Sequence, residues 1–253
     1  MDSARIVGLF RFPVKGLSPE PLQETTLEPG ESISGDRRYA IALGTTKFNP
    51  DAPEHLDKTG FLMLMRDERL AALASFFDEA SQTLVLMRGN GLAIKACLTN
   101  FEAREHMEKF FEHFMGDPES GRPRIVDAPG HSFSDSRHKY VSIINLETLR
   151  DLSARTGRPI ESLRFRGNIY VDGWPAWAEL DLVGKEMAIG DARLSVAAPI
   201  ERCAATNVNP LTAERDMNIP KDLTSLYGHA VMGVYASVTT GGAITLGDTV
   251  TVD

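Results

Sequence analysis

The most restrictive feature of this 253-residue chain is a series of short β-like segments that begins at Asn168 and is broken by tight turns. The segments are rich in β-branched and small apolar residues, and Gly241-Gly242 and Gly247-Asp248 supply residues that accept positive φ. Strands joined by hairpins leave no open edge when they close into a barrel. The pattern therefore predicts a hairpin-built barrel from Ile169–Val171, Arg193–Ala197, Val231–Val238 and Ile244–Val252.

Two strand patterns stand out in the first half of the chain. Arg5 to Phe12 has β-prone content that stops at Pro13, so we expect a strand that runs into a loop. Further on, Arg88-Gly89-Asn90-Gly91 separates two apolar segments, and Asn and Gly accept the positive φ of a hairpin turn. This pattern predicts a hairpin formed by Thr83–Met87 and Leu92–Ala96.

Helical spacing occurs three times. Apolar residues at positions 70, 73, 74 and 77, and again at 107, 110, 111 and 114, predict two amphipathic helices. A strand over Val141–Ile144 and a helix from Leu146 to about Thr156 follow, with Asn145 as N-cap and Gly157 just past the end. The expected class is α+β and mostly β, with a few peripheral helices.

A change in composition suggests where the chain divides. After Gly116 it loosens into Asp117-Pro118-Glu119-Ser120-Gly121-Arg122-Pro123. We expect an N-terminal β-rich subdomain over residues 1–116 and a barrel-like domain over residues 117–253. The boundary is soft, because the first strand is also able to complete the sheet of the second domain.

The composition excludes several classes of protein. Apolar residues make up 42% and charged residues 25%, as in globular proteins with a sizeable core. The formal net charge of −8 argues against nucleic acid as a partner. Two cysteines cannot form a disulfide framework, which indicates a reducing compartment. With no signal-peptide pattern and no apolar run near the roughly 18 residues of a membrane span, we expect a cytoplasmic protein without a membrane partner.

Cys203 is the residue whose surroundings most favour chemistry. It lies between an expected strand and a polar loop, and dinucleotide-binding, P-loop, zinc-protease and serine-hydrolase motifs are absent from the sequence. The adjacent Arg202 favours the thiolate, the form of cysteine that acts as a nucleophile or binds a soft metal. From these residues alone, an inert thiol buried at the end of a strand is an equally good interpretation.

Cations form the second group of candidate residues. Lys15 and Arg37 lie in early loops, and Arg166 precedes Asn168 in a turn just before an expected strand. Guanidinium and ammonium groups at loop ends suit a phosphate or another anionic group, and an amide adds hydrogen-bond donors and acceptors. Each of these residues taken singly has the alternative interpretation of a solvated surface group.

Four segments, in order, resemble the MOSC family, the proteins related to the C-terminal domain of molybdenum cofactor sulfurase. Phe12-Pro13-Val14-Lys15-Gly16 and Gly35-Asp36-Arg37-Arg38 are similar to the N-terminal β-barrel domain that accompanies MOSC. Phe165-Arg166-Gly167-Asn168-Ile169 is similar to the family's Arg-Pro-Asn-Ile element. The most specific segment is Glu201-Arg202-Cys203-Ala204-Ala205-Thr206-Asn207-Val208-Asn209-Pro210, which resembles Arg-Cys-x-x-Thr-x-Val-Asp-Pro.

The resemblance implies a bound molybdenum cofactor with Cys203 as the catalytic residue and as the thiolate ligand to the metal. It also implies that the phosphate and pterin are held by Lys15, Arg37, Arg166, Asn168, Arg202 and Thr206. Gly16, Gly167 and Glu201 depart from the residues common in the family. The loop from Phe133 to Lys139 resembles a further segment near the cofactor, and the resemblance also implies pyridoxal phosphate binding.

Three functions follow from the resemblance. The first is a molybdenum-dependent oxidoreductase that reduces N-hydroxylated or other N- or S-oxygenated small molecules. It would need an external electron-transfer protein, because the chain has no iron–sulfur or flavin motif. The second is a sulfur carrier or transferase with a persulfide on Cys203, and the third is a cofactor-binding protein without catalytic activity.

Overall fold

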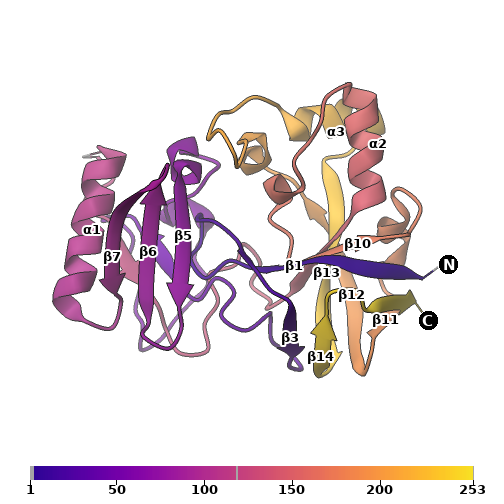
Figure 1. The fold of residues 1–253 in the computed structure, drawn as a ribbon, viewed down its shortest axis with the longest axis horizontal. Coiled ribbons are helices and arrows are strands. Elements are labelled where there is room, and N and C mark those ends of the chain that lie inside the picture. The colour runs from indigo at the N-terminus through magenta and orange to yellow at the C-terminus, as the bar shows by residue number, and fades with distance from the viewer. Residues whose placement is uncertain (1–2, 118, 253) are drawn as a thin grey trace.

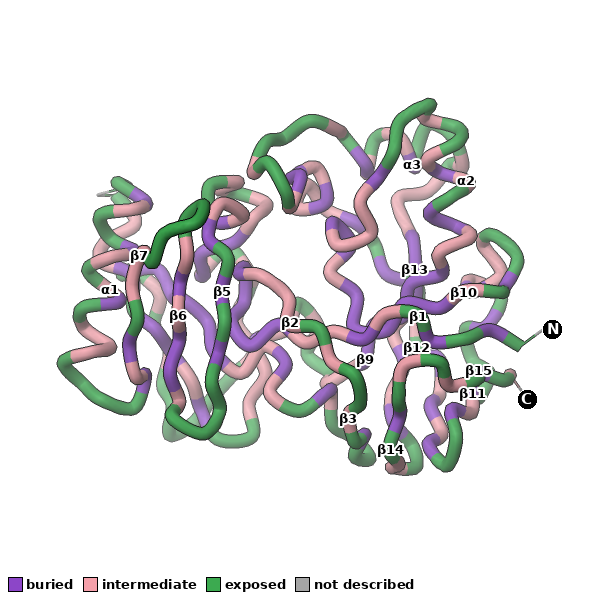
Figure 2. Tube along the Cα trace, viewed as in Figure 1, coloured by how far each residue is buried: buried purple, intermediate pink, exposed green. Residues whose placement is uncertain are grey.

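The structure, a computed structural model, describes residues 3–117 and 119–252. Two units lie side by side in Figure 1, a smaller one formed by the first half of the chain and a barrel formed mainly by the second half. The mostly β class with few helices is confirmed. Figure 2 shows that buried residues follow the strands of both units, whereas the connecting loops are largely exposed.

Seven strands form the closed barrel. They are β1 (Ala4–Arg11), β9 (Val141–Asn145), β10 (Ile169–Asp172), β11 (Glu186–Ile189), β12 (Ala192–Glu201), β13 (Val231–Thr240) and β15 (Thr249–Val252). Their order is β10-β9-β13-β12-β11-β15-β1, and β1 pairs back with β10. Closure places one apolar set of alternating side chains inside, where the fully buried Trp174 and Met187 pack with the barrel strands. The predicted barrel is confirmed.

Strand pairing links the two halves of the sequence. β1 pairs with β10 and β15, so the first strand completes the barrel. After β2 (Glu20–Pro21), β3 (Glu24–Leu27) pairs with β14 (Gly242–Thr245), and β4 (Ala40–Ala42) pairs with β8 (Arg124–Val126). A cut between residues 116 and 117 would separate each of these pairs, and the division at that position stays a prediction.

The N-terminal unit is built on an antiparallel sheet of three strands, β5 (Leu73–Asp78), β6 (Thr83–Arg88) and β7 (Gly91–Cys97). Helix α1 (Phe101–Met115) packs on this sheet through Met107 and Phe111. The predicted hairpin and the predicted helix near residue 107 are confirmed. The resemblance implied a β-barrel in the N-terminal unit. Within the described residues the N-terminal sheet is open, and the closed barrel lies in the other unit.

The predicted helix over residues 70–77 is wrong. A short 3-10 turn, Glu68–Ala72, leads directly into β5, where residues alternate between buried and exposed. Leu73, Ser75 and Phe77 face inward, and the buried Ser75 hid the two-residue period of the strand. Its hydroxyl accepts a hydrogen bond from the Ser18 amide at 3.1 Å, which lets a polar side chain occupy a core position.

The barrel unit carries helices α2 (Leu146–Thr156) and α3 (Ile219–Tyr227). Asn145 caps α2 by accepting a hydrogen bond from the Glu147 amide, and Gly157 ends the helix with φ of 68°, as predicted. Within residues 3–117 and 119–252, no helix combines the length and apolar character needed to cross a membrane. The remaining short 3-10 helices are η1 (Lys58–Gly60), η2 (Glu68–Ala72), η3 (Ser162–Phe165), η4 (Ala178–Leu182) and η5 (Ala204–Asn207).

Candidate functional site

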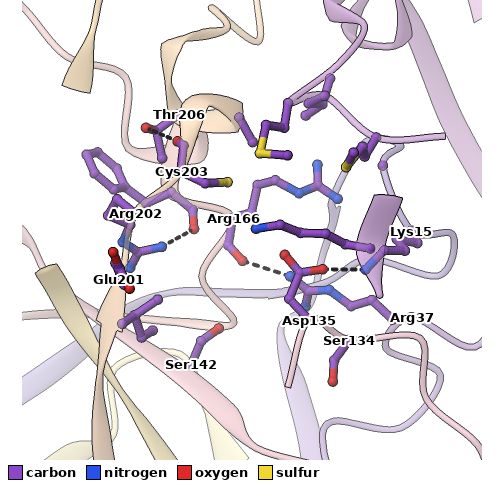
Figure 3. Close-up of a pocket in the computed structure, with 18 of the residues that line it drawn as sticks. Lys15, Arg37, Ser134, Asp135, Ser142, Arg166, Glu201, Arg202, Cys203 and Thr206 are labelled. Atoms are coloured by element: carbon purple, nitrogen blue, oxygen red, sulfur yellow. Dashed lines mark hydrogen bonds and ion pairs between the residues drawn. The ribbon is translucent and has the colours of Figure 1, made fainter. Parts of the chain in front are cut away.

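One pocket lies where the two units meet, and both contribute to its lining (Figure 3). Residues that are far apart in the sequence, from early loops and from the end of β12, face the same space. The pocket brings together all seven residues that the sequence singled out. These are Lys15, Arg37, Arg166, Asn168, Arg202, Cys203 and Thr206.

Cys203 lies at the turn between β12 and η5. Its backbone is extended, and its carbonyl accepts two bonds from Thr206, one from the amide at 3.1 Å and one from the hydroxyl at 2.9 Å. The buried Thr206 therefore fixes the turn that presents the thiol, and its hydroxyl is already engaged with the backbone. The half-buried Cys203 thiol points into the pocket in Figure 3.

Arg202 is a buried cation held by backbone carbonyls. Its Nε donates to the Met232 carbonyl at 2.8 Å, and its Nη1 donates to the Phe165 carbonyl at 2.9 Å. Carbonyl oxygens satisfy hydrogen bonds without cancelling the positive charge. Burial consequently lowers the pKa of Arg202 to about 10, which still leaves the side chain protonated at neutral pH.

Arg37 and Arg166 meet over one aromatic ring. The guanidinium carbon of each lies 4.3 Å from the centroid of Phe12, and Arg37 Nη2 donates to the Arg166 carbonyl at 3.0 Å. Arg37 also pairs with its neighbour Asp36, whereas Arg166 Nη1 donates to the Leu17 carbonyl at 2.8 Å. Burial, reinforced by the Arg37 charge, lowers the pKa of Arg166 to about 9. An anion in the pocket would relieve this repulsion.

Lys15 is buried and forms an ion pair with Asp135. Its Nζ also donates to the Phe133 carbonyl at 2.8 Å. Burial lowers the pKa of Lys15, although the Asp135 charge opposes this change. Burial also acts to raise the pKa of Asp135, but the charge and the hydrogen bond of Lys15, together with the charges of Lys58 and Arg37, outweigh burial and lower the pKa. The loop that resembled a cofactor-proximal segment thus supplies the counter-charge for Lys15.

Asn168 has a structural task within the site. Its Oδ1 accepts from the Ser142 hydroxyl at 2.7 Å and from the Ser142 amide at 3.1 Å, and its Nδ2 donates to the Phe10 carbonyl. These bonds tie the start of β10 to β9 and β1. Most of the hydrogen-bonding capacity that suggested cofactor binding is therefore used inside the protein.

Several lining residues carried no signal in the sequence. Lys58 comes from η1, Met63 and Met65 come from the following loop, and Tyr235 on β13 stacks on Tyr140 at a ring distance of 5.5 Å. Lys58, Met63 and Met65 reach the pocket only because the two units pack together, whereas Tyr235 is placed by the pairing of β13 with β9. Within the described part of the chain, no group of three His, Cys, Asp or Glu side chains comes together as a metal site.

A comparison with protein families matches residues 128–251 to the MOSC domain. Residues 128–251 form a MOSC domain. It contains Cys203, Arg202, Thr206, Arg166 and Asn168, whereas Lys15 and Arg37 precede it and complete the pocket from the other side.

Two curated proteins are also similar in sequence to this chain. The chain is 29% identical over 193 residues to mouse "Mitochondrial amidoxime-reducing component 1", which covers 68% of this chain and 56% of the relative. It is 24% identical over 232 residues to "Molybdenum cofactor sulfurase" of Caenorhabditis elegans, which covers 86% of this chain and 31% of the relative. The chain thus spans about half the length of the mouse relative and about a third of the length of the Caenorhabditis elegans relative. Among solved structures, the YUAD protein from Bacillus subtilis aligns over 99% of this chain and 96% of its own, with 14% identity and a TM-score of 0.46.

Proposed function

We propose that the pocket binds the molybdenum cofactor and that the protein is an oxidoreductase of N-hydroxylated or other N- or S-oxygenated small molecules. The observation that carries the proposal is the meeting of one accessible thiol, Cys203, with cations from both units in a single pocket. The MOSC domain and the names of the two curated relatives support it.

The residues present fit this cofactor chemically. Molybdenum in the cofactor already has two dithiolene sulfur ligands, so a single soft ligand from the protein is enough, and Cys203 offers one. The cofactor also carries an anionic phosphate, for which the half-buried Arg166 and the buried Arg202 provide positive charge without a carboxylate partner in their hydrogen bonds. Lys15 and Arg37 add charge from the opposite side of the pocket.

When bound, the cofactor would supply two-electron chemistry at the N–O bond. For a hydroxylamine, that bond breaks, the substrate gains two electrons and two protons, and the amine and water leave. The electrons come from an external electron-transfer protein. The chain's own contribution is to hold the cofactor through its cations and to fix the Cys203 thiol through the Thr206 bonds.

The first test is the molybdenum and pterin content of protein made in a host that synthesises the cofactor. Elemental mass spectrometry and the fluorescence of the oxidised pterin would be measured for wild type, Cys203→Ala and Cys203→Ser. The second cysteine provides a matched control, because Cys97 lies at the end of β7, outside the residues that line the pocket.

We expect near-stoichiometric molybdenum and pterin in wild type and in Cys97→Ala. In the Cys203 variants we expect loss of molybdenum and of hydroxylamine reduction with a reduced viologen dye, while the fold is kept. Metal content and turnover that are the same in all four proteins would refute the assignment of Cys203.

Transfer of sulfur through a persulfide on Cys203 is the second candidate function. The half-buried thiol opens into a pocket lined by cations, where a sulfur donor can reach it. Cyanide-releasable sulfur in wild type that disappears in Cys203→Ala, with no molybdenum in either, would favour this function. Cofactor bound without turnover or releasable sulfur would instead indicate a cofactor-binding protein.

Pyridoxal phosphate fits the pocket less well than the molybdenum cofactor. Enzymes that use it engage it through a lysine amine. The buried lysine of this pocket, Lys15, already pairs with Asp135 and donates to the Phe133 carbonyl. We therefore assign no step to pyridoxal phosphate.

A further inference from the structure

A second cavity adjoins the site pocket, and most of its lining is apolar. We refer to it as the side chamber. Leu17, Leu163 and Val208 form much of its wall, and Ala71 of η2 contributes from the N-terminal unit. The cavity shares lining residues with the site pocket, so the two spaces abut. The shared residues are Gly16, Leu64, Arg164, Arg166 and Ala205.

The polar groups around the side chamber are largely occupied. The Ser18 hydroxyl donates to the Leu73 carbonyl at 3.0 Å. The Arg164 guanidinium pairs with Glu161 at 2.6 Å and with Asp216 at 2.7 Å. A ligand in the chamber would therefore meet mainly hydrocarbon, with Arg166 at the border to the site pocket.

The outer rim of the chamber includes an exposed apolar residue. Leu211 is 79% exposed and lines the chamber together with Pro210. Both belong to the loop that extends from the barrel unit toward the N-terminal unit, seen in orange in Figure 1. Leu211 and Pro210 thus extend the apolar lining of the chamber to the protein surface.

We infer that the side chamber is the subsite for the apolar body of the substrate, whose oxygenated group then lies in the site pocket toward Cys203. This inference rests on the proposed function. The chamber has a cavity volume of about 120 Å³, close to the roughly 150 Å³ of an apolar cavity that holds benzene. The substrate class is thus an N-oxygenated small molecule with one aromatic ring or a branched alkyl group.

The test compares phenylhydroxylamine with N-methylhydroxylamine, which differ in the apolar body. Ala71→Leu fills part of the chamber, and Ala72→Leu is the matched control because the neighbouring residue does not line the chamber. We expect Ala71→Leu to raise KM for phenylhydroxylamine about tenfold more than KM for N-methylhydroxylamine. Ala72→Leu should leave the ratio of the two KM values as in wild type. Molybdenum and pterin content would be measured in each protein.

Binding of aniline, the product, separates the chamber from the reaction. Isothermal titration of wild type and of both variants with aniline needs no turnover. Loss of aniline binding in Ala71→Leu alone supports the chamber even if no hydroxylamine is reduced, in which case the proposed function fails. Turnover with an unchanged KM ratio and unchanged aniline binding in Ala71→Leu overturns the chamber and leaves the function in place.

Discussion

The cations on the two sides of the pocket differ in their hydrogen-bond partners. On the N-terminal side, Lys15 and Arg37 each pair with a carboxylate, Asp135 and Asp36 respectively. On the MOSC side, the guanidinium groups of Arg166 and Arg202 donate to backbone carbonyls, which leaves their charge uncancelled.

The difference indicates which side binds an anion more strongly. A buried cation without a counter-charge is costly, so an anionic ligand that approaches it recovers more free energy than one that approaches a neutralised pair. We therefore expect the MOSC side to dominate phosphate binding, while the N-terminal side closes the pocket and sets its geometry.

The largest effect is expected from Arg166→Gln. Loss of a charge-assisted hydrogen bond costs about 1.5–3 kcal/mol, which corresponds to about a tenfold to a hundredfold weaker cofactor affinity. Arg37→Gln should weaken affinity less, because Asp36 already neutralises part of the Arg37 charge. The amount of cofactor that stays bound to each variant would be measured as pterin fluorescence after timed gel filtration. Equal losses would contradict the contrast between the sides, and normal retention in both would remove these arginines from the cofactor site.

A second prediction concerns a variant in which a cation of the N-terminal side loses its carboxylate partner, as the cations of the MOSC side lack one. Asp135→Asn removes the counter-charge of Lys15 while Lys15 stays buried. We expect the variant to lose about 1–2 kcal/mol of stability without cofactor, less than a fully buried pair would cost because Asp135 is half exposed.

The same variant should bind inorganic phosphate more tightly than wild type, because Lys15 is no longer neutralised. Urea unfolding and phosphate titration would measure the two effects. Lower stability together with weaker phosphate binding would show that the ion pair supports the site rather than competes with the anion.

The contact between the two units supplies a third prediction. Arg215 Nη2 donates to the carbonyls of Leu64 and Met65 at 2.8 and 3.0 Å, and its Nη1 donates to the carbonyl of Ala204 beside Cys203. Arg215→Gln should cost about 1 kcal/mol, since the side chain is partly exposed, and should speed cofactor release. Glu68→Gln removes only the ion pair to Arg215 and should have a smaller effect that salt abolishes. Equal release rates in wild type and Arg215→Gln would show that this contact does not hold the site together.

Sequence patterns predicted the parts of the fold that depend on local chemistry. The turn at Gly89-Asn90 and the cap at Asn145 follow from backbone preferences that neighbouring residues impose, so both were found. The strand at Leu73 was missed because Ser75 satisfies its hydroxyl with Ser18, which is distant in the sequence. Local periodicity cannot register a partner of that kind.

The same distinction applies to the site. Lys15 and Cys203 stood out because their neighbouring residues resemble family motifs, and the structure places them in one pocket. Tyr235 became a neighbour of that pocket only through the pairing of the barrel strands, and the loop that contains Asp135 was expected near the cofactor without a role for Asp135 itself. The ion pair with Lys15, which decides how that cation behaves, could not be predicted from residues that lie near Lys15 in the sequence.

The smallest expected effect concerns a buried carboxyl group on the barrel side. Glu179 is fully buried, and its Oε2 accepts hydrogen bonds from two neutral groups, Asn145 Nδ2 at 3.0 Å and Thr148 Oγ1 at 2.8 Å. Burial raises the pKa of Glu179 above its ordinary value of 4.5 despite these bonds. Between the unfolded and folded pKa values, the folded protein holds a proton that the unfolded chain has released, so this residue lowers stability as pH rises through that window. Glu179→Gln removes this contribution. Urea unfolding of both proteins from acidic to neutral pH would measure this effect, and the free energy of unfolding of the variant should depend less on pH. Parallel curves for the two proteins would mean that Glu179 is ionised in the folded barrel much as it is in the unfolded chain.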